Sequence, residues 1–349
     1  MTTLPLSLAR RRFHCRGSAL IMVFWLIAML SMIIYSMHTI VSHDLELTIS
    51  QKNAFRARQL AEMGINWAMN PSVKKFDTAI LQQGGGEGGG GGIIPLEEGE
   101  SFWVKIRGEG GRMNINALLQ NDVPHRDFVT KLFNLWGLDN EQADALFDCL
   151  IDWTDAGDEQ LLHGMERKAY LDRDQVEQSP YPFNRPFYTL EEVRLVEGFA
   201  MIEANVPDWR DYFTIYSAGK LDVNEAEAKV MAAAAVACKG TSDPQRDFED
   251  ALKDANELVS HRFGADELED TEDDRKLTAA EVIAGFGLSN DPGSSEGAMA
   301  TAIFGENDPT VHIESVATVG EYRKRVVLIV RNRTQNPQIL SREEVPLFQ

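Results

Sequence analysis

The feature that most constrains this chain is a stretch near its N-terminus, from Ser18 to Ser42, that contains no Asp, Glu, Lys or Arg. A helix of about 20 apolar residues crosses the hydrocarbon core of a bilayer, so this stretch is long enough to span a membrane. A secretory signal has a shorter apolar core, of about 7–15 residues, and ends in a small-residue cleavage site. No A-x-A site closes this stretch, which therefore predicts a membrane helix that the protein retains.

The charges on either side of the stretch predict its orientation. Arginines precede it at positions 10, 11, 12 and 16, and Asp44 and Glu46 follow it. Because Lys and Arg gather on the cytoplasmic side of membrane helices, we expect the N-terminus in the cytoplasm and the rest of the chain outside. Apolar residues then continue at helical spacing beside charged ones as far as Pro71. The helix is therefore predicted over 18–70, with an amphipathic second half.

The residues in front of the apolar stretch resemble a prepilin leader. Arg16 and Gly17 stand directly before it, and "RGSALIMVFWLIAML" resembles the leaders of type IV pilins and of type II secretion pseudopilins. A prepilin peptidase cuts such leaders after the Gly. The resemblance therefore implies a leader of residues 1–17, a cut between Gly17 and Ser18, and a mature protein that keeps the whole apolar helix.

One position departs from most pilins, which carry Glu as the fifth mature residue where this chain has Met22. A carboxylate inside lipid is costly unless it is paired. In pilin-like filaments that Glu is thought to pair with the N-terminal amine of a neighbouring subunit, and a subunit with nothing above it has no such amine to pair with. Absence of the Glu is typical of the K-type minor pseudopilins, the GspK family. Met22 is thus predicted to suit a position at the filament tip.

The rest of the chain divides by composition. The run "GGGEGGGGG" lies in a Gly-rich linker predicted over 71–100, and it lacks the Lys-Ser/Thr of a phosphate-binding loop. Alternating patterns predict antiparallel strands over 101–110 and 310–333. The residues 334–349 show little pattern and are predicted to be a flexible tail.

An internal repeat lies between the predicted strands. "GRMNIN" at 111–116 matches "GKLDVN" at 219–224, and "YTLEEVRLVEGF" at 188–199 resembles "LTAAEVIAGFG" at 277–287. This predicts two related helical domains, 111–218 and 219–290, that resemble SAM-like or helix-hairpin-helix modules. Helix N-caps are expected at the Asn that ends each first motif, and T-x-x-E capping boxes in each second motif. These four positions involve Asn116, Asn224, Thr189 with Glu192, and Thr278 with Glu281.

These parts together predict an α+β fold. It has a long N-terminal transmembrane and amphipathic helix, a small antiparallel pilin-like sheet, and a large helical insertion of two related domains. "GRMNINAL", "DWTDAGDE" and "YTLEEVRLVEGF" resemble signatures of K-type pseudopilins, so the resemblance extends from Arg16 to about Arg331.

The charge of the chain argues against nucleic acid as a partner. Its formal net charge is −20, and removal of the leader with its four arginines would make it −24. Such a surface repels phosphate. Cys149 and Cys238 remain after cleavage; both lie in apolar helical patterns, which favours buried free thiols, and whether they pair is left open.

The sequence offers no catalytic motif and one candidate metal site. There is no HExxH, GxSxG or Walker motif, so we do not expect an enzyme. The acidic run "DWTDAGDEQ" could present oxygen ligands to Ca²⁺, and its alternative is an acidic helix end and loop. A weaker metal candidate is the pair His163 and Glu166. The candidate calcium ligands are Asp152, Asp155, Asp158 and Glu159.

The resemblance implies a function. The protein would be a minor pseudopilin of a type II secretion system that caps the periplasmic pseudopilus and helps to initiate its assembly. It would be a single-pass protein of the inner membrane, with its head in the periplasm. Its partners would be the I-, J- and H-type minor pseudopilins, the major pseudopilin, the prepilin peptidase, the inner-membrane secretion platform and membrane lipid. The alternatives are a signal-anchored periplasmic enzyme or binding protein, and a DNA-binding competence protein.

Overall fold

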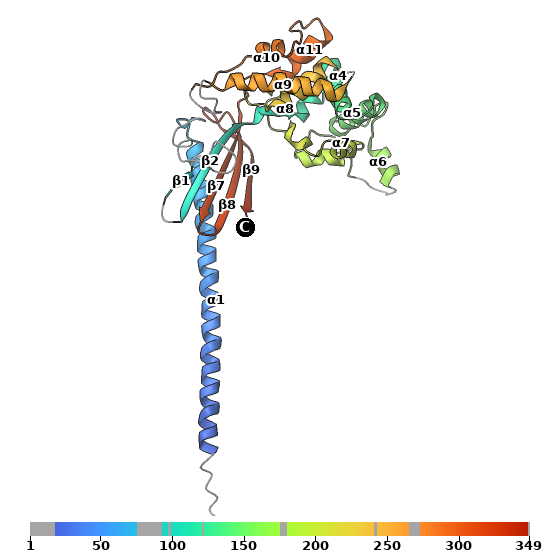
Figure 1. Ribbon diagram of the computed structural model, residues 1–349. Coiled ribbons are helices and arrows are strands. Elements are labelled where there is room, and N and C mark those ends of the chain that lie inside the picture. The colour runs from blue at the N-terminus through green and yellow to red at the C-terminus, as the bar shows by residue number, and fades with distance from the viewer. Residues whose placement is uncertain are drawn as a thin grey trace, which may run out of the picture. The chain divides into compact units, whose positions relative to one another are not determined.

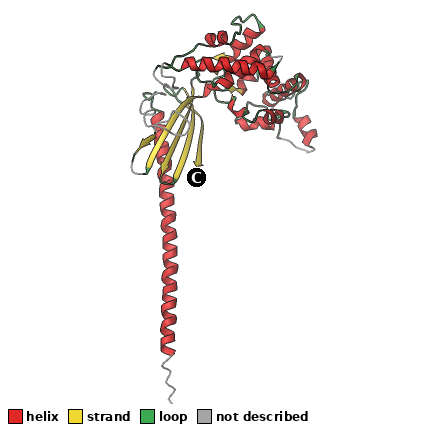
Figure 2. Ribbon diagram, viewed as in Figure 1, coloured by secondary structure: helices red, strands yellow, loops and turns green. Residues whose placement is uncertain are grey.

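The computed structural model of the chain describes residues 18–74, 93–96, 99–120, 122–174, 180–240, 243–264 and 273–347. The proposed cleavage residue Gly17 and the run 84–92 lie outside these ranges. The chain divides into two compact units, Met1–Arg56 and Ala57–Gln349. Figures 1 and 2 show their elements.

The first unit is most of helix α1, which runs without a break from Ser18 to Ala68, as predicted (Figure 1). At 1.5 Å per residue its 51 residues span about 75 Å. None of the described side chains before Ala57 is buried. The predicted amphipathic face is therefore only partly used, because Leu45 and Ile49 are exposed whereas Leu60 and Ile65 are buried.

The second unit contains a five-stranded antiparallel sheet in the order β1-β2-β7-β8-β9. The last turns of α1 pack on it, and alternate residues of β2, namely Phe102, Val104 and Ile106, face the helix in a shared apolar core. Gly64 permits this close packing, because a Cβ there would overlap Ser315 Oγ and lie 2.9 Å from Val104 Cγ2. The strands are β1 (Ile93–Pro95), β2 (Glu100–Gly108), β7 (Thr310–Val319), β8 (Tyr322–Arg331) and β9 (Gln338–Leu347).

The prediction of a flexible tail over 334–349 is wrong, since β9 pairs with β8 along its length. Ion pairs also tie β9 to α1: Glu344 meets Arg58 at 2.9 Å, and Arg342 meets Glu62. The sequence of this segment shows no regular strand pattern because edge strands often carry charged residues and proline, which protect them from pairing with other chains. The predicted linker 71–100 likewise contains an edge strand, β1, in its described part.

Helices and short β-bridges form the insertion between β2 and β7 (Figure 2). Its two halves share one apolar core rather than forming separate ones. The first half has η1 (Glu109–Gly111), β3 (Met113–Asn114), α3 (Ile115–Leu118), α4 (Val123–Leu135), α5 (Asn140–Thr154), α6 (Arg167–Asp174), η2 (Leu190–Leu195), α7 (Phe199–Asn205), η3 (Trp209–Asp211) and β4 (Phe213–Thr214). The second has β5 (Leu221–Asp222), α8 (Ala228–Lys239), α9 (Pro244–Arg262), α10 (Ala279–Gly285), α11 (Ser295–Ile303) and β6 (Phe304–Gly305).

The two halves repeat one another in structure as well as in sequence. Each begins with a short strand that pairs in parallel with the strand at its own end, β3 with β4 and β5 with β6. The second half therefore extends to Gly305 and not to 290, because α11 packs in the shared core and β6 closes the unit.

The repeated Asn residues have a role other than the predicted helix caps. The Asn116 amide accepts from Phe187 N at 2.8 Å and donates to its carbonyl at 3.0 Å. Asn224 makes the same pair of bonds with Leu277, at 2.8 and 2.9 Å. Each Asn side chain thus makes the paired donor and acceptor bonds that a neighbouring strand would make, and it holds the first motif of its repeat against the second. The cap of α3 is Asn114, whose side chain accepts from two backbone N–H groups.

Only one of the two predicted capping boxes forms. Thr278 and Glu281 make both reciprocal bonds at the start of α10. Thr189 makes no side-chain cap, because Glu192 is drawn instead to Arg185 at 3.0 Å and the segment is a 3₁₀ helix.

Candidate functional site

Helix α5 positions the candidate site. It starts at a capping box between Asp139 and Gln142, and its end is fixed by Trp153, which is fully buried and packs edge-on against Tyr170 with ring centroids 5.7 Å apart. Trp153 is therefore a core residue.

Two buried carboxylates lie one turn apart on α5, at Asp148 and Asp152. Residues at i and i+4 share a helix face, and both side chains point to the loop 155–166 that follows. One Asp148 oxygen accepts from the backbone N–H of His163 at 3.1 Å, and both Asp152 oxygens lie 3.2 Å from the N–H of Leu161. Gly164 lets the loop approach this closely, since a Cβ there would overlap the Asp152 carboxylate.

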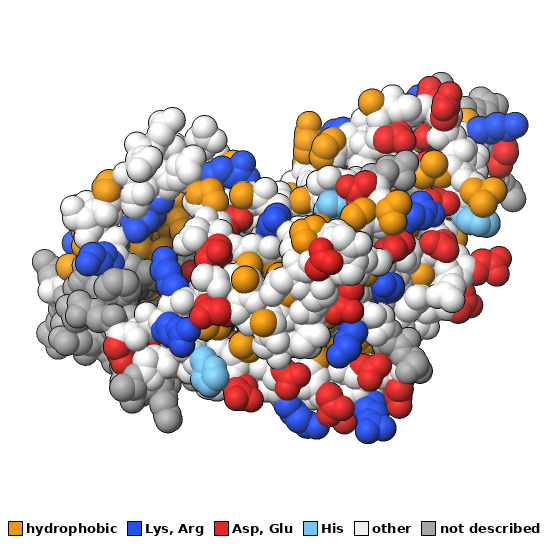
Figure 3. Space-filling model, turned by 90° about the horizontal axis from the view of Figure 1, so that it is seen from above, with side chains coloured by type: hydrophobic (Ala, Val, Ile, Leu, Met, Phe, Trp, Pro, Cys, Tyr) orange, Lys and Arg blue, Asp and Glu red, His pale blue; other side chains and the backbone are white. Residues whose placement is uncertain are grey.

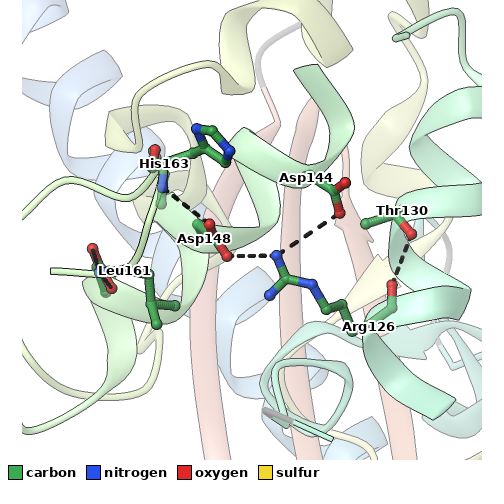
Figure 4. A network of polar contacts seen from close by, with 8 residues as sticks. Arg126, Thr130, Asp144, Asp148, Leu161 and His163 are labelled. Atoms are coloured by element: carbon green, nitrogen blue, oxygen red, sulfur yellow. Dashed lines mark hydrogen bonds and ion pairs between the residues drawn. The ribbon is translucent and has the colours of Figure 1, made fainter. Parts of the chain in front are cut away.

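Arg126 of α4 completes the network (Figure 4). Its guanidinium donates to the other oxygen of Asp148 at 2.7 Å and lies 3.8 Å from Asp144. It also lies 4.9 Å from the ring centroid of Phe147. A buried carboxylate costs free energy unless it is paired and hydrogen-bonded, and Asp148 has both a cation and a backbone donor.

Asp152 and Glu166 form no ion pair with a Lys, Arg or His among the residues that the structure describes. Glu166 Oε1 is buried and has no hydrogen-bond partner among the described residues. Burial, with the nearby charges of Asp155 and Asp148, raises the pKa of Asp152 to about 6. Burial, with the charges of Asp152, Asp155 and Asp158, raises the pKa of Glu166 to about 7. Both carboxyl groups therefore hold their protons to a higher pH than ordinary carboxyl groups do.

The predicted calcium ligands do not converge on one point. Asp152 points inward to the loop, Asp155 is half-buried, and Asp158 and Glu159 are exposed. Asp155 accepts from the N–H of Gly157 at 2.9 Å, which makes a local turn. In the described part of the chain no three His, Cys, Asp or Glu side chains are grouped so as to hold a metal ion. Calcium binding therefore stays a prediction.

The raised pKa values predict how stability depends on pH. Both acids bind protons more tightly in the folded chain than in the unfolded one, so ionising them costs folding free energy. In EGTA, the melting temperature of the detergent-solubilised chain should therefore rise as the pH falls from 8 through about 7 and 6 towards 5. Replacing both Asp152→Asn and Glu166→Gln should flatten this curve.

Equal melting temperatures at pH 8 and pH 5.5 would contradict this prediction, as would an unchanged rise in the double variant. Calcium in place of EGTA provides a further measurement, because a bound cation would remove the same penalty at pH 8. No effect of calcium at pH 8 would argue against a site here.

Among the other sequence-predicted groups, the Cys149 thiol adjoins this network, because it donates to the carbonyl of His163 at 3.5 Å. Cys149 and Cys238 are both buried free thiols, as favoured. His163 enters the network through its backbone N–H and not its ring. Sequence reasoning missed Asp148. Its signal was present, since an Asp at i−4 from Asp152 on an otherwise apolar helix face must find a partner when it is buried.

The second candidate site is the exposed part of α1. Among the described residues, α1 is the one helix that is both long enough and apolar enough to cross a membrane. Its most apolar window has a mean hydropathy of 2.3, and none of the residues in that window is buried. Met22 lies in it and is 71% exposed. This fits a single-pass membrane anchor.

Comparison with known proteins gives a sequence match to one family domain and a similarity in fold to a solved structure. Residues 111–205 match the family model described as type II secretion system protein K. A chain in the crystal structure of the GspK–GspI–GspJ complex from the enterotoxigenic Escherichia coli type 2 secretion system has a similar fold. The TM-score is 0.53 at 15% identity, with 87% of this chain and 99% of that one covered. No curated protein sequence matches the chain.

Proposed function

We propose that this chain is a K-type minor pseudopilin, because residues 111–205 match the type II secretion protein K domain. It stands at the tip of the periplasmic pseudopilus and helps to initiate its assembly. The predicted family and the role of a minor pseudopilin in type II secretion are supported by that domain, and the predicted fold class is confirmed by the similar fold of the solved chain. The tip position is the further step.

The single observation that carries the tip position is the apolar residue Met22 in a helix without a charge from Ser18 to Ser42. In a filament of such helices, a buried Glu at this position would need the amine of the subunit above it. Met22 carries no charge and needs no amine to pair with, so this subunit tolerates the absence of a subunit above it. A helical insertion between β2 and β7 adds bulk to the head, which also suits an end rather than the middle of a filament.

The exposed side chains of α1 support the membrane and assembly roles. Within the described residues, no segment covers the apolar side chains from Leu20 to Val41, and a surface of that kind must be covered by lipid or by sister helices. The proposed covering helices are those of the I-, J- and H-type minor subunits and of the major pseudopilin. The head then lies in the periplasm, and the role requires no catalysis.

Cleavage by a prepilin peptidase tests the proposal directly. Replacing Gly17→Leu should block removal of the leader, so that the chain keeps its first 17 residues and secretion falls to the level of cells that lack the chain. Mass spectrometry of the membrane-extracted protein and a secretion assay measure the two effects. The matched control is Cys15→Leu, a similar change two residues away, which should leave both unaltered. A wild-type protein that still begins at Met1 would instead favour the signal-anchored enzyme or binding protein.

A further inference from the structure

One apolar side chain of the head stands out by its exposure. Leu162 is 87% exposed, which exceeds the value for every other large apolar residue in the described ranges, including those of α1 such as Met22 at 71%. An exposed Leu forgoes the favourable free energy of burying its side chain. A single exposed Leu is common in proteins, so its significance depends on how it is held.

The loop that carries Leu162 is fixed on both sides of it. The N–H of Leu161 is held by Asp152 and the N–H of His163 by Asp148, both from the buried face of α5. Gln160 Nε2 also donates to the carbonyl of Gly164 at 2.7 Å, across the Leu162 turn. Two buried carboxylates thus hold the backbone on either side of one exposed apolar residue, and Figure 4 shows the bond between Asp148 and the backbone of His163.

The surroundings of Leu162 in this loop are acidic. Asp158 and Glu159 are exposed and Asp155 is half-buried, and none of the three forms an ion pair with another described residue. A second segment is joined to them where the Asn184 amide donates to the carbonyl of Gly157 at 2.7 Å. On the face drawn in Figure 3, acidic and basic side chains are interspersed.

From this arrangement we propose that Leu162 is the anchor of a protein-binding surface made by the loop 155–166. The partner is a protein with an apolar pocket that receives Leu162. Lys and Arg side chains around that pocket would face the acidic residues of the loop, which are Asp155, Asp158 and Glu159. Interface energy concentrates in a few apolar anchors that enter pockets, and a loop that is already ordered loses little entropy on binding. The acids set the charge of the partner and speed its approach. The proposal rests on the proposed function, because it places the partner where secretion depends on it.

The experiment uses cells that make the full chain with their own type II secretion system. Replacing Leu162→Ser should lower secretion by about tenfold or more, the loss typical of an anchor residue. Reversing the charges with Asp158→Lys and Glu159→Lys should lower it as well. The matched controls are Ile339→Ser, which is 62% exposed on β9, and Glu257→Lys on α9; both should secrete as the wild type does.

Two measurements exclude a simple loss of the protein: leader removal and the melting temperature should be the same for Leu162→Ser and Ile339→Ser. Secretion by Leu162→Ser equal to that of Ile339→Ser would overturn the proposed surface. So would a charge-reversed chain that secretes normally. The proposed function fails in a different way, namely when cells without the chain secrete normally.

Discussion

Replacing Gly64→Leu is expected to separate the end of α1 from the sheet and to destabilise the second unit by about 3 kcal/mol or more. Gly64 is buried, and even a Cβ at this position would overlap Ser315 Oγ and lie 2.9 Å from Val104 Cγ2 and 3.0 Å from Phe102 Cδ2. Leu has a higher helix propensity than Gly, but this favours the substitution by only about 1 kcal/mol. Packing therefore decides the sign. Thermal unfolding of the full chain in detergent measures the loss.

A smaller change makes the same prediction quantitative. Gly64→Ala should cost about 1–3 kcal/mol, and Ser315→Ala should recover part of that loss, because it removes the oxygen that the new methyl group meets. Ser315→Ala alone should be close to neutral, since Ser315 Oγ is buried without a hydrogen-bond partner among the described residues. Met63→Leu, next to Gly64 and 40% exposed, serves as the control. Additive effects of the Gly64 and Ser315 changes would show that the two sites do not meet.

The sequence predicts the elements of this protein best where periodicity is long or repeated. The bounds 18–70 and 101–110 lie close to those of α1 and β2, and the repeat of "GRMNIN" and "GKLDVN" predicts two halves that the structure shows with equivalent β-bridges. These patterns persist because one face of each element must be buried.

The failures concern partners distant in the sequence. Asn116 and Asn224 are good N-cap residues by type, yet each bonds a residue far along the chain, Phe187 or Leu277. No local pattern encodes that choice. The strand β9 was missed for a related reason: its charges are typical of a solvent-exposed tail, and they become meaningful only beside Arg58 and Glu62 of α1.

The candidate site divides in the same way. An acidic helix end and loop are predictable from "DWTDAGDEQ", and the structure has both. The separation of Asp152, which is buried, from the half-buried Asp155 and the exposed Asp158 depends on the path of the loop back to α5. The sequence therefore shows that carboxylates gather here but not which of them face inward.

Asp148 is the residue on which the loop depends most, and Asp148→Ala should cost about 3 kcal/mol. The substitution leaves the Arg126 guanidinium without its 2.7 Å partner and the N–H of His163 without its acceptor. Arg126 is about one-third exposed and recovers part of its solvation, which keeps the loss at the lower end for a buried pair. Asp144→Ala, which removes a half-exposed carboxylate 3.8 Å from the same guanidinium, should cost less than about 1 kcal/mol.

Hydrogen exchange separates the loss of the loop from a general loss of stability. In the wild type the amide of His163 donates to Asp148 and that of Leu161 to Asp152. In Asp148→Ala the His163 amide should lose its protection, whereas in Asp144→Ala both amides should keep theirs. Core amides of α5, such as that of Leu150, should stay protected in both variants, because they bond within the helix. If the His163 amide exchanged at the same rate in the wild type and in Asp148→Ala, Asp148 would not hold the loop, and the rigid presentation of Leu162 would lose one of its two supports.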